Sequence, residues 1–489
     1  MLDIRSTPGR LESDRRWEEL ARAIAARAGS LRDNPAPSNG LKGRLIVLGS
    51  GIEAAGFTLD AEMYIKGADE VFYCVADPAT QVWLRERRPD AYDLYTLYDD
   101  GKPRYRTYMQ MTEAMLHFVR LGKTVAAVYY GHPGVFALSP HRAIAIARRE
   151  GHEAVMKAAV SALDTLCADL GVDPSFPGML TYEATEMMLR DRKPDPSLHV
   201  VLWQVGVVGE MGYDRKGFSN SRFPVLLDYL SEIYGEDYEL VHYIASRYPT
   251  IPHVEERLTI AALRDPAAYA RINGISTFYL PPKVGARTND ATAARLGFET
   301  ANAKPHPPLR AIDRYGRREL DAVREMATFT VPSGYAYQER TRSAEFILAL
   351  TSDLELQERY RRDPRAAVSP DVFPGLSRWE RSLLASRDSG RVQIAAKFAA
   401  LHGGPSASNV TSALAEQNVD VDVVVDTDID VDTDVDVDID VDVDIDAAIV
   451  VDVDIDVDVD IDNVVDVVQD VDIDVVVDVV PDVPNHPKS

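Results

Sequence analysis

The 489-residue chain carries 78 acidic and 53 basic side chains, a formal net charge of −25 at pH 7. Residues 418–482 hold 25 Asp and no Lys or Arg, so the rest of the chain is balanced at 53 acidic and 53 basic residues. This balance argues against nucleic-acid binding, which needs a basic face. The two cysteines, Cys74 and Cys167, are too few for a disulfide framework.

Residues 1–40 are charged and then rich in Pro, Ser and Asn, without the apolar core of a signal peptide. No run of 18 apolar residues follows anywhere in the chain. We therefore expect a soluble, cytoplasmic protein with no membrane partner and no nucleic-acid partner.

The body of the chain alternates between apolar runs and segments of helical periodicity. Five apolar runs predict buried strands: residues 43–48, 70–75, 124–129, 200–205 and 238–244. Residues 109–120 and 139–150 predict helices between them. This alternation indicates an α/β fold with a largely parallel sheet. Residues 305–397 predict a mostly helical second domain, and residues 402–408 are typical of a linker.

The tail alternates Val or Ile with Asp, so an extended strand would be β-branched on one face and acidic on the other. Because like charges on neighbouring strands repel, we expect the free tail to stay extended, disordered and unpaired. Two further interpretations stay open. The tail is a low-complexity repeat without function, or an acidic module that binds cations or basic proteins, although the Gly turns of calcium loops are missing.

Two glycine turns follow predicted strands. Gly49 and Gly51 end the first strand, and residues 128–136 (Val-Tyr-Tyr-Gly-His-Pro-Gly-Val-Phe) lie between a strand and a helix. Open α/β sheets bind ligands at such strand ends, so these turns indicate a cofactor crevice. The alternative is a structural turn packed with aromatic residues.

Tyrosines and arginines crowd into residues 92–108, on either side of a turn at residues 99–103. Aromatic residues at this spacing usually belong to a core. A phenol beside a guanidinium group is, however, more easily ionised, which predicts a lowered Tyr pKa suited to abstracting a weakly acidic proton.

Four segments resemble the fungal borosin precursors, which are peptide α-N-methyltransferases fused to their own substrate: residues 49–51, 130–136, 181–185 and 203–206. The resemblance spans about residues 41–417. It implies a tetrapyrrole-methylase-like (class III) S-adenosylmethionine methyltransferase domain, a helical clasp and a C-terminal core peptide. The implied parts are an N-terminal extension (1–40), the methyltransferase domain (41–285), the clasp (286–397), a linker (398–417) and the core peptide with its follower (418–489).

The resemblance also implies roles for individual residues. The expected catalytic set is Tyr95, Tyr98, Arg104 and Tyr108. With Gly49 and Gly51, the expected cofactor-binding residues are Tyr130, His132, Pro133, Gly134, Val135, Phe136, Ser161, Ala162, Gln204 and Gly206. The tail residues expected to be methylated include Val419, Val421, Val423, Val424, Val425, Ile429 and Val431.

In this interpretation a Tyr98 or Tyr108 phenolate removes the amide proton while Arg104 stabilises charge on the carbonyl oxygen. No metal is expected. The family implies an interlocked homodimer in which each tail enters the partner's site, and a downstream protease or cyclase that releases the natural product. Ala158 and Ala159 stand where the family usually has Pro-Gly.

An Asp-rich substrate is unusual, because moving an unpaired carboxylate into a dry site costs several kcal/mol. Basic residues along the path, or Asp side chains that stay in solvent, would avoid this cost. Candidates for such a path are Arg85, Arg87, Arg88 and Arg106. The competing hypothesis is a small-molecule methyltransferase of the tetrapyrrole type with an unmodified acidic tail.

Overall fold

The computed structural model describes residues 8–31, 40–215, 217–283, 289–297, 315, 317–333, 340–398, 436–443 and 451–458. The chain divides into two compact units: Met1–Tyr335 with Thr351–Leu354, and Ala336–Leu350 with Glu355–Ser489. Among the described residues, no helix is long and apolar enough to cross a membrane.

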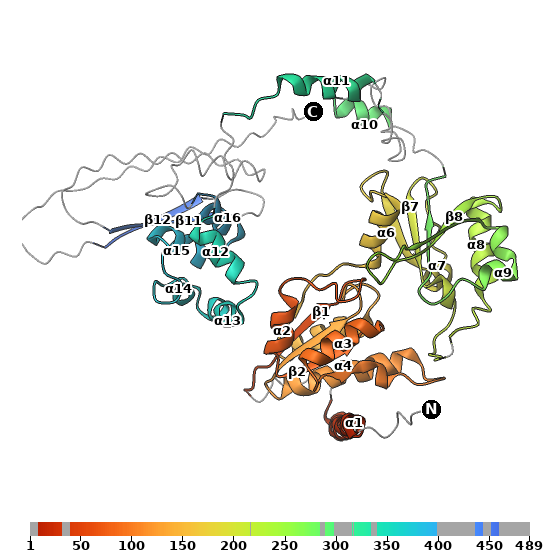
Figure 1. The fold of residues 1–489 in the computed structure, drawn as a ribbon, viewed down its shortest axis with the longest axis horizontal. Helices are drawn as coiled ribbons and strands as arrows, with labels where there is room; N and C mark the ends of the chain where they lie inside the picture. The colour runs from red at the N-terminus through yellow and green to blue at the C-terminus, as the bar shows by residue number, and fades with distance from the viewer. Residues whose placement is uncertain are drawn as a thin grey trace, which may run out of the picture. The chain divides into compact units, whose positions relative to one another are not determined.

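The first unit begins with a five-stranded, all-parallel sheet in the order β3-β2-β4-β1-β5 (Figure 1). The strands are β1 (Arg44–Gly49), β2 (Glu70–Cys74), β3 (Tyr92–Asp93), β4 (Thr124–Tyr129) and β5 (Glu153–Met156). Three of them match predicted strands to within about a residue, because their apolar runs are buried on both faces.

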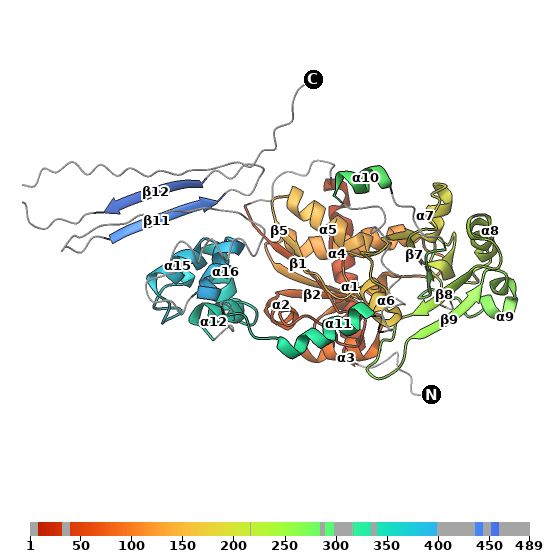
Figure 2. The same cartoon turned by 90° about the horizontal axis from the view of Figure 1, so that it is seen from above.

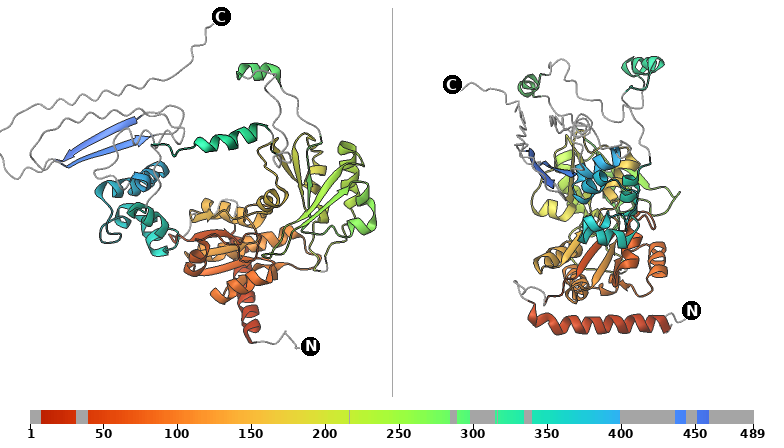
Figure 3. Two further views of the ribbon diagram at one scale, coloured as in Figure 1. Left: turned by 45° about the horizontal axis from the view of Figure 1, so that its top comes forward. Right: turned by 90° about the vertical axis from the view of Figure 1, so that its left-hand side faces the viewer.

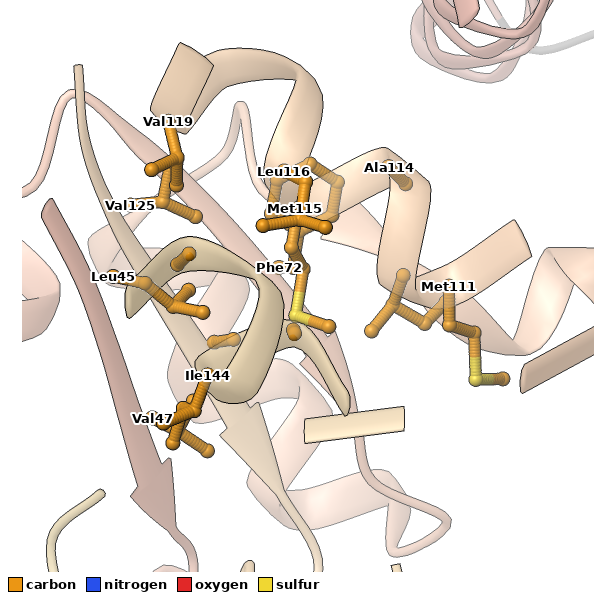
Figure 4. Close-up of a cluster of buried hydrophobic side chains, with 14 of the residues drawn as sticks. Leu45, Val47, Phe72, Met111, Ala114, Met115, Leu116, Val119, Val125 and Ile144 are labelled. Atoms are coloured by element: carbon orange, nitrogen blue, oxygen red, sulfur yellow. The ribbon is translucent and has the colours of Figure 1, made fainter. Parts of the chain in front are cut away.

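Helices cover both faces of this sheet. Leu45 and Val47 of β1 point to one face, where they pack with α4 (Arg104–Arg120) and α5 (Leu138–Arg149), as Figure 4 shows. Ile46 and Leu48 point to the other, against α2 (Ala61–Gly67) and α3 (Pro78–Arg87). This alternation follows from the two-residue period of a strand.

The helix α1 (Pro8–Arg27) packs on the first core (Figure 3). Leu20 is buried there, and the Trp17 ring meets Tyr92 at 5.1 Å between centroids. This part of the predicted N-terminal extension therefore stabilises the body of the protein.

The second lobe of this unit is a mixed sheet in the order β6-β7-β10-β8-β9 (Figure 2). The strands are β6 (Met179–Glu183), β7 (His199–Trp203), β8 (Glu239–Ile244), β9 (Val254–Thr259) and β10 (Thr277–Leu280). Only β6 and β7 pair in parallel; the other pairs are antiparallel. The expected largely parallel sheet is therefore correct for the first lobe and wrong for the second, where β8 and β9 follow one another across a short connection instead of a helical crossover.

Helices of the second lobe are α6 (Ala162–Leu170), α7 (Ala184–Leu189), α8 (Phe223–Tyr234) and α9 (Pro266–Tyr269). Two further helices, α10 (Asp290–Arg295) and α11 (Arg317–Glu325), lie between this lobe and the second unit in the sequence.

The second unit has the predicted helical character. Its helices are α12 (Arg342–Ala349), α13 (Leu354–Arg362), α14 (Pro364–Ala367), α15 (Arg378–Ala385) and α16 (Ser389–Phe398). They enclose a small core around Phe346 and Leu384. Ser377 caps α15 in a capping box with Glu380, whose carboxylate also accepts a hydrogen bond from the Ser343 hydroxyl at 2.7 Å.

Two segments of the tail, β11 (Asp436–Val443) and β12 (Val451–Asp458), form an antiparallel pair. The register places Asp436 opposite Asp458 and Val437 opposite Val457, so each residue of one strand faces an identical residue of the other. Both segments are extended, as expected of the tail, and they are paired with each other, which the sequence did not predict. The seven named methylation candidates and residues 399–417 of the predicted linker lie outside the described residues.

The helical core predicts a sharp contrast within α12. Phe346 is fully buried, whereas Leu348 is 67% exposed. We expect Phe346→Ala to lower the free energy of unfolding of this unit by about 3–5 kcal/mol, because it leaves a cavity. The control Leu348→Ala should change it by less than about 0.5 kcal/mol. Urea unfolding of the two variants measures both, and equal effects would contradict this core.

Candidate active site

The carboxyl ends of the parallel strands bring the two predicted glycine turns to one edge of the first sheet, beside the end of β2. The turn after β1 meets the turn after β4. The Gly131 N–H donates to the Gly51 carbonyl at 3.0 Å, and the Ser50 N–H donates to the Tyr129 backbone carbonyl at 2.8 Å. The Tyr130 N–H donates to the Cys74 carbonyl of β2 at 3.1 Å. These bonds place Gly49, Gly51 and Tyr130 together, as the sequence predicted.

Gly49 is the tightest point of this edge. A Cβ atom there would lie 2.2 Å from the Gly131 carbonyl oxygen, 2.5 Å from the Ala159 Cβ and 2.8 Å from Pro133. Only a glycine allows the chain segments after β1, β4 and β5 to approach so closely. The methyl group of Ala159, at the position where the family usually has Gly, fills space beside this turn.

The segment His132 to Phe136 forms a fixed turn whose apolar tip is exposed. The Gly134 N–H donates to His132 Nδ1 at 3.0 Å, and His141 Nε2 lies 2.9 Å from the Gly134 carbonyl oxygen. Phe136 has a positive φ of 54° and is 50% exposed. A non-glycine residue in this conformation is held there by its surroundings, and half of the Phe136 side chain stays exposed.

The second lobe contributes from across the site. The Phe136 ring meets Trp203 at 5.3 Å between centroids, next to Gln204, which has a φ of 58°. A Cβ on Gly206 would lie 1.9 Å from the Asn273 carbonyl oxygen, so this turn is also closely packed.

Ser161 and Ala162 stand at the start of α6. The Ser161 hydroxyl caps the helix by accepting from the Leu163 N–H at 3.2 Å, and it donates to Asp164 at 2.7 Å. The main contribution of Ser161 is therefore to fix the chain where it leaves β5.

The predicted tyrosine cluster assembles around Tyr98. Its ring centroid lies 5.4 Å from that of Tyr95 and 6.4 Å from that of Tyr108, at an edge-to-face angle. Tyr213, from the loop after β7, stacks on Tyr98 at 4.5 Å. The Arg215 guanidinium from the same loop donates to the Tyr98 carbonyl at 3.1 Å.

Arg104 opens α4 beside this cluster but points toward the same loop. Its backbone N–H donates to the Met211 carbonyl at 3.0 Å, and its guanidinium donates to the Glu210 carbonyl. The guanidinium carbon lies 5.8 Å from the Phe218 ring centroid. Arg104 therefore joins the two lobes and already bonds a backbone carbonyl oxygen.

The acidity of the phenols differs from what the sequence suggested. Burial raises the pKa of Tyr98 well above its usual range, and the neighbouring Tyr108 adds to this rise. Burial likewise raises the pKa of Tyr95. The prediction of a Tyr pKa lowered by a guanidinium group is wrong for both residues. Desolvation dominates, and the Arg104 guanidinium donates to the Glu210 backbone carbonyl instead of a phenol.

Comparisons with known proteins agree with this architecture. A family model for tetrapyrrole (corrin/porphyrin) methylases matches residues 44–204, which include the first sheet and its glycine turns. A model for the borosin biosynthesis clasp domain matches residues 314–426, which include the helical unit.

The chain is 43% identical over 379 residues to a methyltransferase/ribosomally synthesized type III borosin cyclic peptide precursor of Anomoporia bombycina, covering 74% of this chain and 44% of that one. It is 40% identical to the dendrothelin A precursor of Dendrothele bispora and 39% identical to the omphalotin A precursor of Omphalotus olearius. Each of these alignments covers 73% of this chain and 88% of the relative. The chain belongs to the borosin family of methyltransferase–precursor fusions.

The family resemblance, the tetrapyrrole-methylase-like fold and the helical clasp predicted for this borosin precursor are thus confirmed. The chain spans less than half the length of the Anomoporia relative. The roles of the individual site residues stay predictions.

The loop after β7 supplies Glu210, Tyr213 and Arg215 to the site, and none of these residues was predicted from the sequence. This loop borders a cavity of about 490 Å³ lined by Gly101, Glu210, Gly212, Tyr213, Asp214, Gly217, Phe218 and Ser219. Its signal was present in the glycines and aromatic residues that follow a predicted strand.

Two of the four arginines considered for a substrate path are engaged elsewhere. Arg87 pairs with Glu62 at 2.8 Å, and Arg88 pairs with Asp90 at 2.7 Å. Arg85 and Arg106 are exposed. No group of three or more potential metal ligands occurs among the described residues.

The chain segments after β1, β4 and β5 approach one another closely at Gly49, so we expect Gly49→Ala to push these three segments apart. We expect the overpacking to cost about 1–3 kcal/mol of stability and to weaken binding of the expected cofactor, S-adenosylmethionine. The control Gly29→Ala adds a Cβ with no neighbour within 4 Å and should leave both unchanged. Thermal unfolding and titration calorimetry measure the two effects, and an unaltered Gly49→Ala variant would contradict this packing.

Proposed function

We propose that this borosin precursor uses S-adenosylmethionine to methylate backbone amide nitrogens of its own C-terminal tail, residue after residue and in trans within a homodimer. The observation that carries the proposal is the Tyr98, Tyr108 and Arg104 cluster. It lies between two lobes, in a chain whose relatives are methyltransferase–precursor fusions.

The glycine turns suit a cofactor that lacks phosphate groups. No helix begins directly after Gly51, since α2 starts at Ala61, so the helix N-terminus that usually binds phosphate is missing there. The one lysine in the chain segment after β5, Lys157, pairs with Asp60 at 2.8 Å. The exposed Phe136 and Val135 offer apolar surface instead. S-adenosylmethionine would bring a methyl group activated by its positively charged sulfur.

The protein's own residues would handle the amide proton and the amide charge. An amide nitrogen is a poor nucleophile because its lone pair is delocalised into the carbonyl group. Tyr98 or Tyr108 would accept the proton from the nitrogen, and negative charge would then develop on the carbonyl oxygen. Arg104 would stabilise that oxygen by exchanging the Glu210 carbonyl for the carbonyl of the substrate.

Fusion of enzyme and tail supports the choice of substrate. A tethered tail has a high effective concentration, so weak contacts suffice to bring successive amides to the site. N-methylation would also remove the N–H groups that tail segments such as β11 and β12 use for pairing. A protease or cyclase acting later would release the peptide.

The tetrapyrrole-methylase match also supports a second candidate, a small-molecule methyltransferase whose acidic tail stays unmodified. A chain ending at residue 417 that still methylates an added tetrapyrrole would favour it. Loss of all transfer on removal of the tail would favour the tail as substrate.

Trypsin provides a direct test, because residues 398–487 contain no Lys or Arg and the tail is released as one peptide, 398–488. We expect its mass to exceed the encoded mass by a series of methyl-sized steps, and fragmentation to locate them on backbone nitrogens of Val and Ile. An unmodified peptide from protein that binds S-adenosylmethionine would contradict the proposal.

The raised pKa of Tyr98 predicts a strong dependence on pH if its phenolate is the base. Below the pKa of a phenol, its ionised fraction rises about tenfold per pH unit, so the initial methylation rate should climb from pH 7 to 9 without levelling off. Tyr98→Phe should abolish most transfer, and Tyr108→Phe should leave residual transfer with the same profile. A plateau below pH 9, or equal residual activity in both variants, would rule out Tyr98 as the single base.

A further inference from the structure

A groove of about 460 Å³ runs between α4 and α5, on the outer face of the first lobe. Its lining combines apolar side chains with basic ones: Tyr105, Met109, Leu138, Ile146, Arg142 and Arg149. No carboxylate lines it. The catalytic proposal above does not use this groove.

The apolar part of the groove is open to solvent. Tyr105 is 59% exposed and Leu138 is 46% exposed. Apolar side chains that line a groove can contact the apolar side chains of a bound segment.

The basic part lies along one side of α5. Arg142 and Arg149 are seven residues apart, which places them on the same face two turns apart. Both are exposed and have no ion-pair partner among the residues that the structure describes. Nearby carboxylates are committed elsewhere, since Glu113 and Glu150 both pair with Arg120 at 2.8 Å.

We propose that this groove docks an extended segment of the Val/Ile-Asp tail, with its β-branched face on the apolar residues and its carboxylates at Arg142 and Arg149. The proposal builds on the proposed function by assigning a separate recognition surface to the substrate. An alternating strand carries both kinds of side chain that the groove matches. The 12-residue helix α5 is about 18 Å long, the length of about five or six extended residues.

The place of the groove explains how an acidic tail can be a substrate. Tyr105 follows Arg104 in the chain, and His141 of the groove lies 2.9 Å from the Gly134 carbonyl oxygen in the predicted cofactor turn. A docked strand would therefore keep its carboxylates paired outside the site while a neighbouring amide reaches Tyr98. Carboxylates paired in this way avoid the cost of entering a dry site unpaired.

Photo-crosslinking in the full-length protein tests the docking without relying on methyl transfer. A photoreactive phenylalanine analogue replaces Ala145, which lines the groove, or Ala267, an exposed alanine of α9, as control. After irradiation and trypsin digestion, position 145 should crosslink to the tail peptide 398–488 at least tenfold more than position 267. Equal yields, or crosslinks from position 145 to another segment or to a helix of a second copy, would overturn the proposal.

Charge reversal tests the role of the arginines. Combining Arg142→Glu with Arg149→Glu should lower the crosslink yield about tenfold, whereas Arg22→Glu with Arg190→Glu changes the net charge equally and should not. Replacing the tail Asp residues by Asn should remove the difference between the two double variants. Equal yields from both double variants would overturn the role of the arginines.

Crosslinking and mass measurement also separate the two proposals. Tail crosslinks without methylation would support the docking groove and contradict the proposed function. Methylation without tail crosslinks would do the reverse.

Discussion

The close approach of three strand ends at Gly49 is the constraint on which the site depends. Parallel strands send their carboxyl ends to one edge, but only a missing Cβ allows the segments carrying Gly131, Pro133 and Ala159 to come together there. This contact fixes the turn that presents Phe136, and the Phe136 ring in turn meets Trp203 of the second lobe. One glycine thus connects the first sheet to the residues expected to hold the cofactor.

Burial controls the chemistry at the tyrosine cluster more strongly than charge does. Tyr98 lies under Tyr213, against Tyr95 and Tyr108, and loses the solvent that would stabilise a phenolate. Arg104 does not offset this loss, because its guanidinium donates to a backbone carbonyl. The same geometry suits an arginine that stabilises a substrate amide oxygen, and a phenolate of raised pKa is a stronger base once it forms.

The alternating tail combines two properties that separate onto opposite faces of a strand. In β11 and β12 this alternation produces a register in which Asp faces Asp. A groove that supplies arginines instead of carboxylates would be a better partner for the same pattern. The body of the chain has equal numbers of acidic and basic residues, but the groove between α4 and α5 is locally basic, and the acidic tail is proposed to bind there.

The sequence by itself determined the parallel first sheet, the helical second unit, the glycine turns and the membership of Tyr98 and Tyr108 in one cluster. These follow from apolar runs, glycine positions and near-neighbour spacing, which are local properties. The tertiary structure alone decided the mixed second sheet, the stacking of Tyr213 on Tyr98, the direction of Arg104 and the raised pKa of Tyr98. Each of these depends on burial or on contacts between residues far apart in the chain, such as Arg104 and Glu210, and no local pattern records which distant group a side chain will meet.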